Sequence, residues 1–268
     1  METDGWISMY VDRQLQMLFD YDRDWDLDLY VLNHSVPEFG GFSRTLARYK
    51  KQTNPAFGDK LYENLGPLQE YGKAGGFTDV TRYSGILTNV LGFGLGIGIS
   101  DVNLDGWPDI YVSNDYNEQD YLYINQKNKS FKESLSEHIN HTSLFSMGND
   151  IADINNDALP DILTLDMLPE GNYRQKLSVG SDNYEKHQLL YKQGFYHQYM
   201  RNMLHLNLGN GGFSEIGQVA GISKTDWSWA ALFADYDNDG WKDLFITNGY
   251  KADYTNMDFL AYSANAQI

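Results

Sequence analysis

The stretch DYDNDGWKDLFI, residues 235–246, places Asp at its first, third, fifth and ninth positions and then continues into alternating apolar residues. The same arrangement, with Asp or Asn at these positions, occurs three more times, as DYDRDWDLDLYV from Asp20, DVNLDGWPDIYV from Asp101 and DINNDALPDILT from Asp153. The apolar residues that follow each copy predict a β-strand beginning near the ninth position. Four copies in one chain make coincidence a poor explanation, so we expect the fold to be organised around this acidic repeat.

The spacing within the acidic repeat suits a hard divalent cation. Ca²⁺ takes six to eight oxygen ligands at about 2.3–2.6 Å, and a tight loop with acidic or amide side chains at positions 1, 3 and 5 turns three of them inward. The acidic side chain at position 9 and the backbone carbonyl at position 7 complete the expected shell. We therefore predict four Ca²⁺ sites, one per loop, with these ligands: Asp20, Asp22, Asp24, Asp26 and Asp28; Asp101, Asn103, Asp105, Trp107 and Asp109; Asp153, Asn155, Asp157, Leu159 and Asp161; Asp235, Asp237, Asp239, Trp241 and Asp243.

Two other interpretations of these loops must be weighed. An EF-hand needs a bidentate Glu at loop position 12 and flanking helices, whereas position 12 here is Val31, Val112, Thr164 or Ile246 and the flanking residues are strand-like. Solvated Asx turns that bind nothing remain an alternative for any single copy. Four copies with three or more carboxylates each argue against that alternative, because closely packed, unneutralised carboxylates repel one another.

The four loops differ at position 6, where the sharp turn favours a positive φ. Gly106 and Gly240 suit that conformation, but Trp25 and Ala158 carry a Cβ atom, at a cost of about 1 kcal/mol. We therefore expect the first and third loops to be more strained, and the third, which also has Asn155 in place of a carboxylate, to bind the metal most weakly.

A second repeat follows three of the acidic loops. Its copies begin DKLYEN at Asp59, DYLYIN at Asp120 and NMLHLN at Asn202, and each predicts a strand, a turn and a further strand beginning at Phe. An apolar strand also precedes each acidic loop. The unit is thus a four-stranded antiparallel meander, as in a β-propeller blade.

The predicted fold class is therefore all-β, a β-propeller of four-stranded blades that forms an incomplete ring. The predicted units are residues 1–13 (partial), 14–86 with an insertion at 34–58, 87–143, 144–222 with an insertion at 166–201, and 223–268 (partial). Within the second insertion, aromatic residues at helical spacing predict a helix near 182–200, more as a packing face than as a ligand platform. The first insertion is locally basic.

Composition narrows the classes of partner. The chain has 268 residues, and its 37 acidic against 20 basic residues give a net charge of -17, which argues against nucleic acid as a partner. Cysteine is absent, which excludes disulfides, thiolate nucleophiles and zinc–thiolate sites. We predict no transmembrane span, because no apolar run approaches the ~18 residues required. An export signal would lie outside this sequence.

The phrases GFGLGIGISDVNLDGWPDIYVSNDY and WSWAALFADYDNDGWKDLFITNGYKADYTNMDF resemble the FG-GAP/VCBS repeat, the calcium-loop blade of integrin α subunits and cartilage acidic protein. They are similar also to VCBS-repeat surface proteins of Bacteroidota. The resemblance implies an extracellular, cell-surface or periplasmic calcium-binding propeller. It implies little about chemistry, because adhesins, receptors and a few enzymes share this scaffold.

No catalytic motif is evident in the sequence. The six histidines stand in no nucleophile-elbow or HExxH arrangement. We therefore predict a non-catalytic binding or adhesion module whose ligand is a glycan or a surface protein. The alternative is a calcium-dependent, lyase-like enzyme acting on polysaccharides with the same scaffold.

Overall fold

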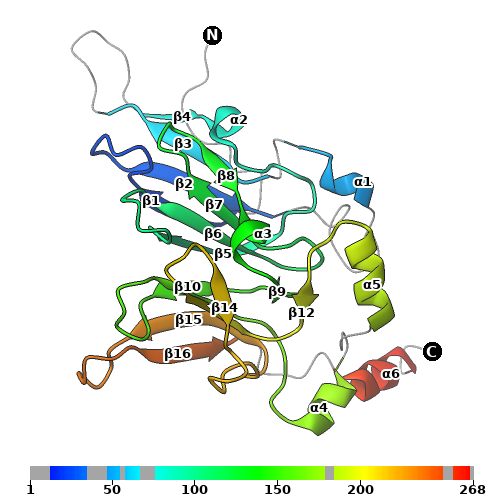
Figure 1. Ribbon diagram of the computed structural model, residues 1–268. Coiled ribbons are helices and arrows are strands. Elements are labelled where there is room, and N and C mark those ends of the chain that lie inside the picture. Colours follow the sequence, from blue (N-terminus) through cyan, green and yellow to red (C-terminus); the bar gives the residue numbers. More distant parts are fainter. Residues whose placement is uncertain are drawn as a thin grey trace.

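The computed structural model describes residues 13–34, 47–54, 58–66, 76–178, 184–249 and 256–265, and these form a mainly β structure (Figure 1). Three antiparallel sheets have four strands each, in the order of the sequence. They are β1 (Arg13–Phe19), β2 (Asp28–Asn33), β3 (Lys60–Asn64) and β4 (Phe77–Asp79); β5 (Gly94–Ser100), β6 (Asp109–Asn114), β7 (Tyr121–Asn125) and β8 (Phe131–Glu133); β10 (Asn149–Ala152), β11 (Asp161–Thr164), β13 (Met203–Asn207) and β14 (Phe213–Glu215).

A fourth sheet has two strands among the described residues, β15 (Ser228–Ala234) and β16 (Asp243–Asn248). The short strands β9 (Thr142–Ser143) and β12 (Gln198–Tyr199) form a parallel pair. The helices are α1 (Ala47–Lys50), α2 (Thr81–Ser84), α3 (Leu135–His138), α4 (Asn172–Leu177), α5 (Tyr184–Lys192) and α6 (Met257–Asn265). None of the described helices is long and apolar enough to cross a membrane.

The predicted four-stranded meander is confirmed for three sheets, with each acidic loop between the first and second strands. The helix predicted near 182–200 is α5, which begins at Tyr184 and ends at Lys192. The sheets close no ring among the described residues. Residues 1–12 and most of the insertion at 34–58 lie outside the described residues, so the partial unit predicted there is not located and only part of the basic segment is described.

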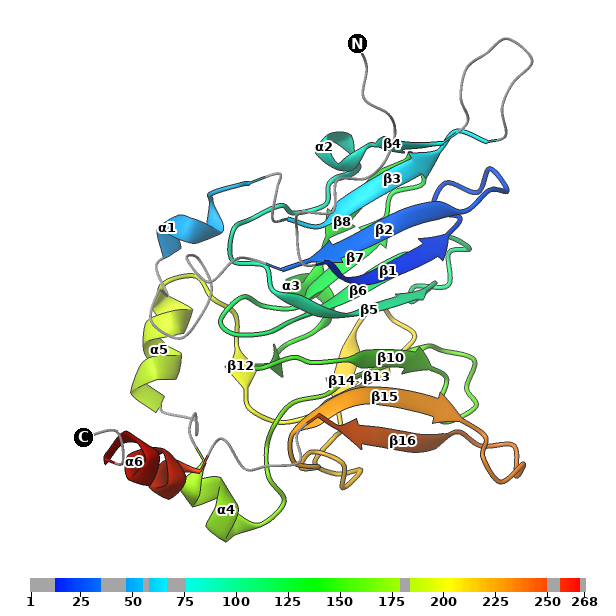
Figure 2. The ribbon, with the colours of Figure 1, turned by 180° about the vertical axis from the view of Figure 1, so that it is seen from behind.

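The sheets stack through apolar faces, with β1, β5, β10 and β15 succeeding one another down the molecule (Figure 2). Between the first two sheets lie Tyr30, Leu32, Ile110 and Val112, all at most 1% exposed. Further clusters fill the next two interfaces, including Tyr111 with Ile162 and Leu163 with Phe233. The second and third strands of the two inner sheets, β6, β7, β11 and β13, are almost entirely buried on both faces, which explains their apolar runs.

An acidic or amide side chain just before the third strand joins that strand to the second. Asp120 Oδ1 accepts the Asn114 N–H at 2.9 Å, and its Oδ2 accepts the Tyr111 hydroxyl at 2.7 Å. Asp59 makes the same two bonds with Asn33 and Tyr30. In the third sheet the equivalent residue is Asn202, whose Oδ1 accepts the N–H of Asp166 at 2.7 Å.

Substitution of Asp120 by Asn should flatten the pH dependence of stability. Burial raises the pKa of the Asp120 carboxyl to about 7, although bonds from Asn114 and Tyr111 lower it. The native state therefore holds this proton more tightly than the unfolded chain, so the stability it contributes is fully present below about pH 4 and is lost as the pH rises through about 7. Urea unfolding in the presence of a chelator should show that the free energy of unfolding falls less between pH 5 and 8 for Asp120→Asn than for the wild type. An equal loss would contradict this origin.

Candidate metal-binding loops

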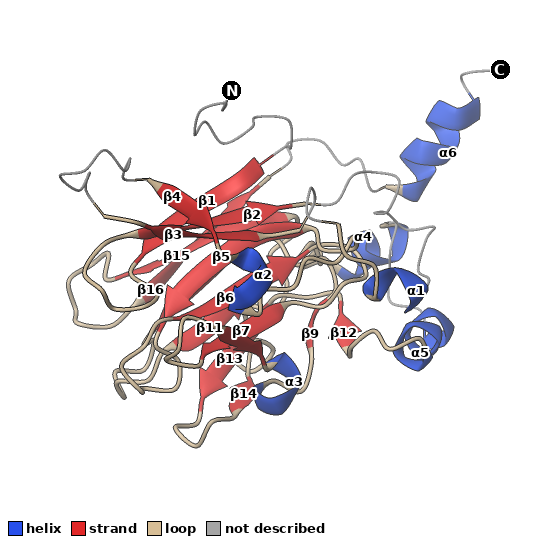
Figure 3. Cartoon of the chain, turned by 90° about the horizontal axis from the view of Figure 1, so that it is seen from above, coloured by secondary structure: helices blue, strands red, loops and turns tan. Residues whose placement is uncertain are grey.

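The four acidic loops lie at one end of the sheets, and α1, α4 and α5 lie at the other (Figures 1 and 3). Adjacent loops are in contact. The Asn156 amide of the third loop donates to the Gly240 carbonyl of the fourth at 3.0 Å, and the Arg23 guanidinium of the first lies 5.5 Å from the Trp107 ring of the second. The repeats thus bring the acidic loops together along one edge of the molecule.

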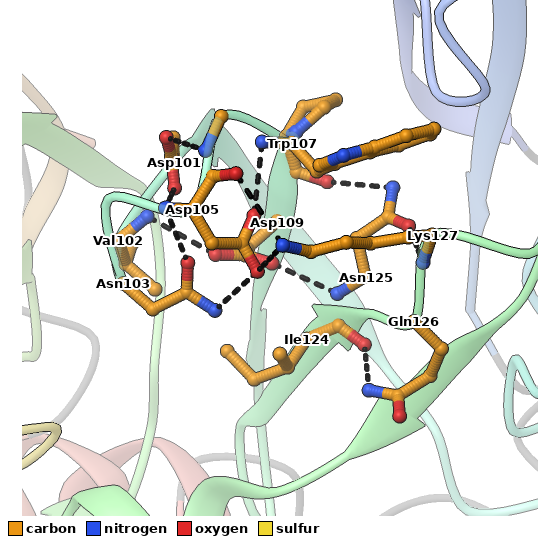
Figure 4. A network of polar contacts seen from close by, with 12 residues as sticks. Asp101, Val102, Asn103, Asp105, Trp107, Asp109, Ile124, Asn125, Gln126 and Lys127 are labelled. Atoms are coloured by element: carbon orange, nitrogen blue, oxygen red, sulfur yellow. Dashed lines mark hydrogen bonds and ion pairs between the residues drawn. The ribbon is translucent and has the colours of Figure 1, made fainter.

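Figure 4 shows the second loop. Asp101 Oδ1 accepts the N–H of Asp105 at 2.9 Å, and its Oδ2 accepts the N–H of Gly106 at 2.7 Å. Asn103 Oδ1 accepts the same Asp105 N–H at 3.0 Å, and Asp105 Oδ1 accepts the N–H of Trp107 at 3.0 Å. These bonds close the loop and gather the side chains of positions 1, 3 and 5 above it.

The other loops repeat this pattern. In every loop, the carboxylate of the Asp at position 1 accepts the backbone N–H groups of positions 5 and 6. These bonds measure 2.9–3.1 Å in the first, third and fourth loops. Position 5 accepts the N–H of position 7 in every loop. The backbone thus holds both carboxylate oxygens at position 1 and one at position 5, which fits a preorganised cation site.

Positions 4 and 6 adopt the left-handed conformation in all four loops. At position 6, φ is 87° for Gly106 and 90° for Gly240, but also 76° for Trp25 and 66° for Ala158, as the sequence predicts. The left-handed residues at position 4 were not foreseen; they are Arg23, Leu104, Asn156 and Asn238, with φ of 57–62°.

Ala158→Gly should stabilise the protein, because glycine removes the cost of a Cβ atom at φ 66°. We expect a gain of about 0.5–1 kcal/mol in the free energy of unfolding. The matched control is Gly106→Ala, which introduces the same strain at φ 87° and should cost at least as much. Urea unfolding of both variants measures the effect, and a loss in Ala158→Gly would contradict the assignment of strain.

The acidic residue at position 9 joins the loop to the third strand. Asp109 is 1% exposed; its Oδ2 accepts the Val102 N–H at 3.1 Å and its Oδ1 accepts the Asn125 N–H at 2.8 Å. The Asn125 amide in turn donates to the Tyr21 carbonyl in the neighbouring loop at 2.8 Å. Asp161 and Asn207 repeat the arrangement, with the Asn207 amide bonded to the Val102 carbonyl.

Burial makes these position-9 carboxylates difficult to ionise. Burial raises the pKa of Asp109 to about 7, against the lowering effect of its two N–H donors, and the charges of Asp105 and Asp101 raise it further. Burial also raises the pKa of Asp28 to about 6 and raises the pKa of Asp161. A bound cation would favour the ionised forms and so lower these pKa values.

The donor sets of two loops are compact enough to share one ion. Asp20, Asp22 and Asp28 each offer a carboxylate oxygen within 4.8 Å of the others, and so do Asp235, Asp237 and Asp239. In the second and third loops, Asn stands at position 3, and its amide donates to Asp105 or Asp157. The carbonyls predicted as ligands at Asp26, Trp107, Leu159 and Trp241 remain predictions.

Two lysines from a neighbouring turn reach the loops, which the sequence patterns did not indicate. Lys129 Nζ lies 2.7 Å from Asp22 Oδ2 and 2.6 Å from Glu63 Oε1, and the Asp22 side chain is 1% exposed. Lys127 Nζ lies 3.3 Å from Asp105 Oδ2. Their side chains place ammonium groups against carboxylates that are predicted to bind metal.

Histidines gather elsewhere, near β12. The His187 and His197 rings stack at 5.6 Å, and the His141 ring lies 6.5 Å from that of His205. Burial lowers the pKa of His205 to about 3, so it is neutral at physiological pH. The Tyr199 ring lies between the rings of His141 and His187, so these ring contacts join β13 to the insertion.

The predicted aromatic stripe of the insertion is divided between the core and the surface. Phe195 is 2% exposed and packs against Leu91 and Leu190, whereas Tyr184 and Tyr191 are 77% and 48% exposed. Lys50, from the basic segment, forms an ion pair at 3.4 Å with the buried Glu118. Part of the stripe is therefore a packing face and part is open to solvent.

No curated protein matches the sequence. The family model described as FG-GAP-like repeat matches residues 101–164 and 195–246. The first segment contains the second and third acidic loops with β6–β11, and the second contains the third strand of the third sheet and the fourth loop. Since these segments carry the loop and strand repeats described above, the chain contains FG-GAP-like repeats.

Proposed function

We propose that the chain is a calcium-binding, non-catalytic β-propeller module of an exported or cell-surface protein, which binds a glycan or a protein ligand. The observation that carries this proposal is the repetition of one loop geometry four times along one edge, with position 1 and position 5 carboxylates fixed by backbone N–H groups. Asx turns need no such convergence of three or more carboxylates. Four Ca²⁺ ions would neutralise the negative charge of these carboxylates and stiffen the loops.

Calcium would act on the scaffold rather than on a substrate. Each loop joins two strands of its sheet, and in the three four-stranded sheets position 9 also connects the loop to the third strand. An ion held by one loop would therefore fix three strands at once. The contacts between neighbouring loops would extend this stiffening along the edge.

The proposed ligand surface is the opposite end of the sheets, where the helices of the insertion lie (Figure 3). Exposed aromatic rings are available there: Tyr173 on α4 is 78% exposed, and Tyr184 and Tyr191 lie on α5. Rings that are apolar on their faces and polar at one end suit both sugar rings and protein surfaces. A rigid scaffold that carries a variable insertion is a common arrangement for binding.

The ligand proposal is tested by binding to glycan arrays and immobilised polysaccharides, with turnover of acidic polysaccharides measured in parallel. We expect binding that Tyr184→Ser and Tyr191→Ser weaken at least fivefold. Tyr83→Ser is the matched control, because Tyr83 is equally exposed, at 77%, but lies on α2. Calcium-dependent release of unsaturated products would contradict the non-catalytic assignment and favour the lyase-like alternative.

Lys129→Met should raise the calcium affinity of the first loop. The Lys129 ammonium pairs with Asp22, a proposed ligand, and must leave it when an ion binds. Removal of this competing cation should lower the Kd of one site by about three- to tenfold, which corresponds to about 0.7–1.4 kcal/mol. Isothermal titration measures the change. Lys132→Met is the control, because Lys132 pairs with the exposed Glu137; an equal effect there would contradict the competition.

A further inference from the structure

The second and third strands of each complete sheet meet in one conserved register within this chain. The residue at loop position 11 pairs with a Leu of the third strand: Tyr30 with Leu61, Tyr111 with Leu122, and Leu163 with Leu204. These leucines are 0–4% exposed. The corresponding residue of the fourth sheet is Phe245 on β16, which is 56% exposed, and β16 has no strand on its outer side among the described residues (Figure 2).

A second contact is made in three sheets and lacks its donor in the fourth. Asp28, Asp109 and Asp161 each accept, through Oδ1, the N–H of an Asn on the third strand at 2.8–2.9 Å. Asp243 Oδ2 accepts the Tyr236 N–H at 3.0 Å, as in the other loops. No described residue donates to Asp243 Oδ1, and the residue is exposed.

A third contact fixes the other end of the same strand pair. Asp59, Asp120 and Asn202 accept the N–H at loop position 14, and the equivalent position in the fourth sheet is Asn248. The third strand of each four-stranded sheet therefore carries three residues at the same spacing: the Asp or Asn that accepts this N–H, the buried Leu, and the Asn that donates to position 9. The segments are 59–64, 120–125 and 202–207, each of the form Asp or Asn, any residue, Leu, two residues, Asn.

We propose that β16 is a docking edge for a β-hairpin whose first strand has this Asp/Asn-x-Leu-x-x-Asn pattern. Its Leu would cover Phe245, its Asn N–H would donate to Asp243 Oδ1, and its first side chain would accept the Asn248 N–H. Backbone pairing with an open edge supplies affinity, and the three side chains fix the register. The apolar outer face, with Leu232 at 54% and Tyr236 at 52% exposure, borders this edge.

A second copy of the chain is the main competing occupant, because β16 itself reads Asp243-x-Phe245-x-x-Asn248 and could pair with itself about a two-fold axis. Two observations favour the hairpin. Each of the three complete sheets places Leu, and not an aromatic ring, opposite position 11. A pair of copies would also bring together two acidic loops on chains of net charge -17.

The test adds to the full chain a synthetic peptide of residues 119–134, which form β7, its turn and β8. Hydrogen exchange of residues 243–248 is followed by mass spectrometry, up to about 1 mM peptide. The same peptide is also attached after residue 268 through a Gly/Ser linker, which gives a millimolar effective concentration. The matched control peptide carries Asp120→Ala and Leu122→Ser, which remove the side-chain acceptor for the Asn248 N–H and the Leu that would cover Phe245.

We expect the attached peptide to slow exchange of residues 243–248 at least tenfold and the control peptide to leave it unchanged. Equal exchange with both peptides, free and attached, would overturn the proposal. Protection that appears without peptide and rises with protein concentration, together with a dimer in sedimentation, would also overturn it in favour of a second copy. Asp243 is also a proposed calcium ligand, so exchange is measured both with Ca²⁺ and with EGTA. Protection of residues 243–248 in EGTA would support the docking edge whether or not the loops bind calcium.

Discussion

Removal of calcium with EGTA is expected to lower the melting temperature by tens of degrees if all four loops are occupied. A ligand present at one hundred times its Kd stabilises the native state by about 2.7 kcal/mol. For a chain of this size, one kcal/mol corresponds to roughly 2–4 °C, so each occupied loop contributes roughly 5–10 °C. The carboxylates of an emptied loop would in addition repel one another; burial is the main cause of the raised pKa of Asp109, and the charges of Asp105 and Asp101 raise it further.

The measurement is a thermal melt followed by circular dichroism, with calcium, with EGTA, and with calcium restored. Asp239→Ala in the fourth loop should remove the increase in melting temperature that one bound ion provides, because it deletes a carboxylate within 4.8 Å of its two neighbours. In EGTA the variant and the wild type should melt within a few degrees of each other. Identical melting curves with and without EGTA would contradict metal binding in these loops.

Asp109→Ala should be among the most destabilising single substitutions in the chain, even without metal. It leaves two backbone N–H groups, those of Val102 and Asn125, without their acceptor in a buried site. A buried donor without a partner costs about 1–3 kcal/mol, so we expect a loss of about 2–6 kcal/mol. Release of the buried charge offsets part of this cost at high pH, which makes pH 6 the better condition.

Asp243→Ala provides the matched control, because Asp243 stands at the same loop position but is exposed and accepts a single N–H, that of Tyr236. In EGTA, Asp243→Ala should lower the free energy of unfolding by less than about 1.5 kcal/mol. Urea unfolding of the two variants in EGTA compares them directly. Equal losses would mean that the bond to the third strand does not contribute to stability, contrary to the structure.

The sequence predicts the strands and loops well because both depend on local chemistry. Alternating apolar residues after Asp28, Asp109, Asp161 and Asp243 predict strands that begin at those residues, as the structure has them. The left-handed turn at position 6 follows from Gly106 and Gly240. Such features need only residues close together in the chain.

The contacts missed by sequence reasoning join distant residues. The Asn125 amide reaches the Tyr21 carbonyl across two sheets, and Lys129 reaches Asp22. Their partners are set by how the sheets stack, which no local pattern encodes. The parallel pairing of Gln198 with Thr142 and the histidine cluster beside it have the same origin, because an insertion folds back onto a neighbouring sheet.

The number of calcium ions bound per chain tests the central claim most directly. Protein stripped with EGTA and dialysed against buffered ⁴⁵Ca²⁺ should bind four ions per chain, and each of Asp101→Ala and Asp239→Ala should lower that number by one. Arg82→Ala, remote from the loops on α2, should leave it unchanged. Absence of bound calcium at millimolar concentration, or a number that the loop variants do not change, would contradict the account.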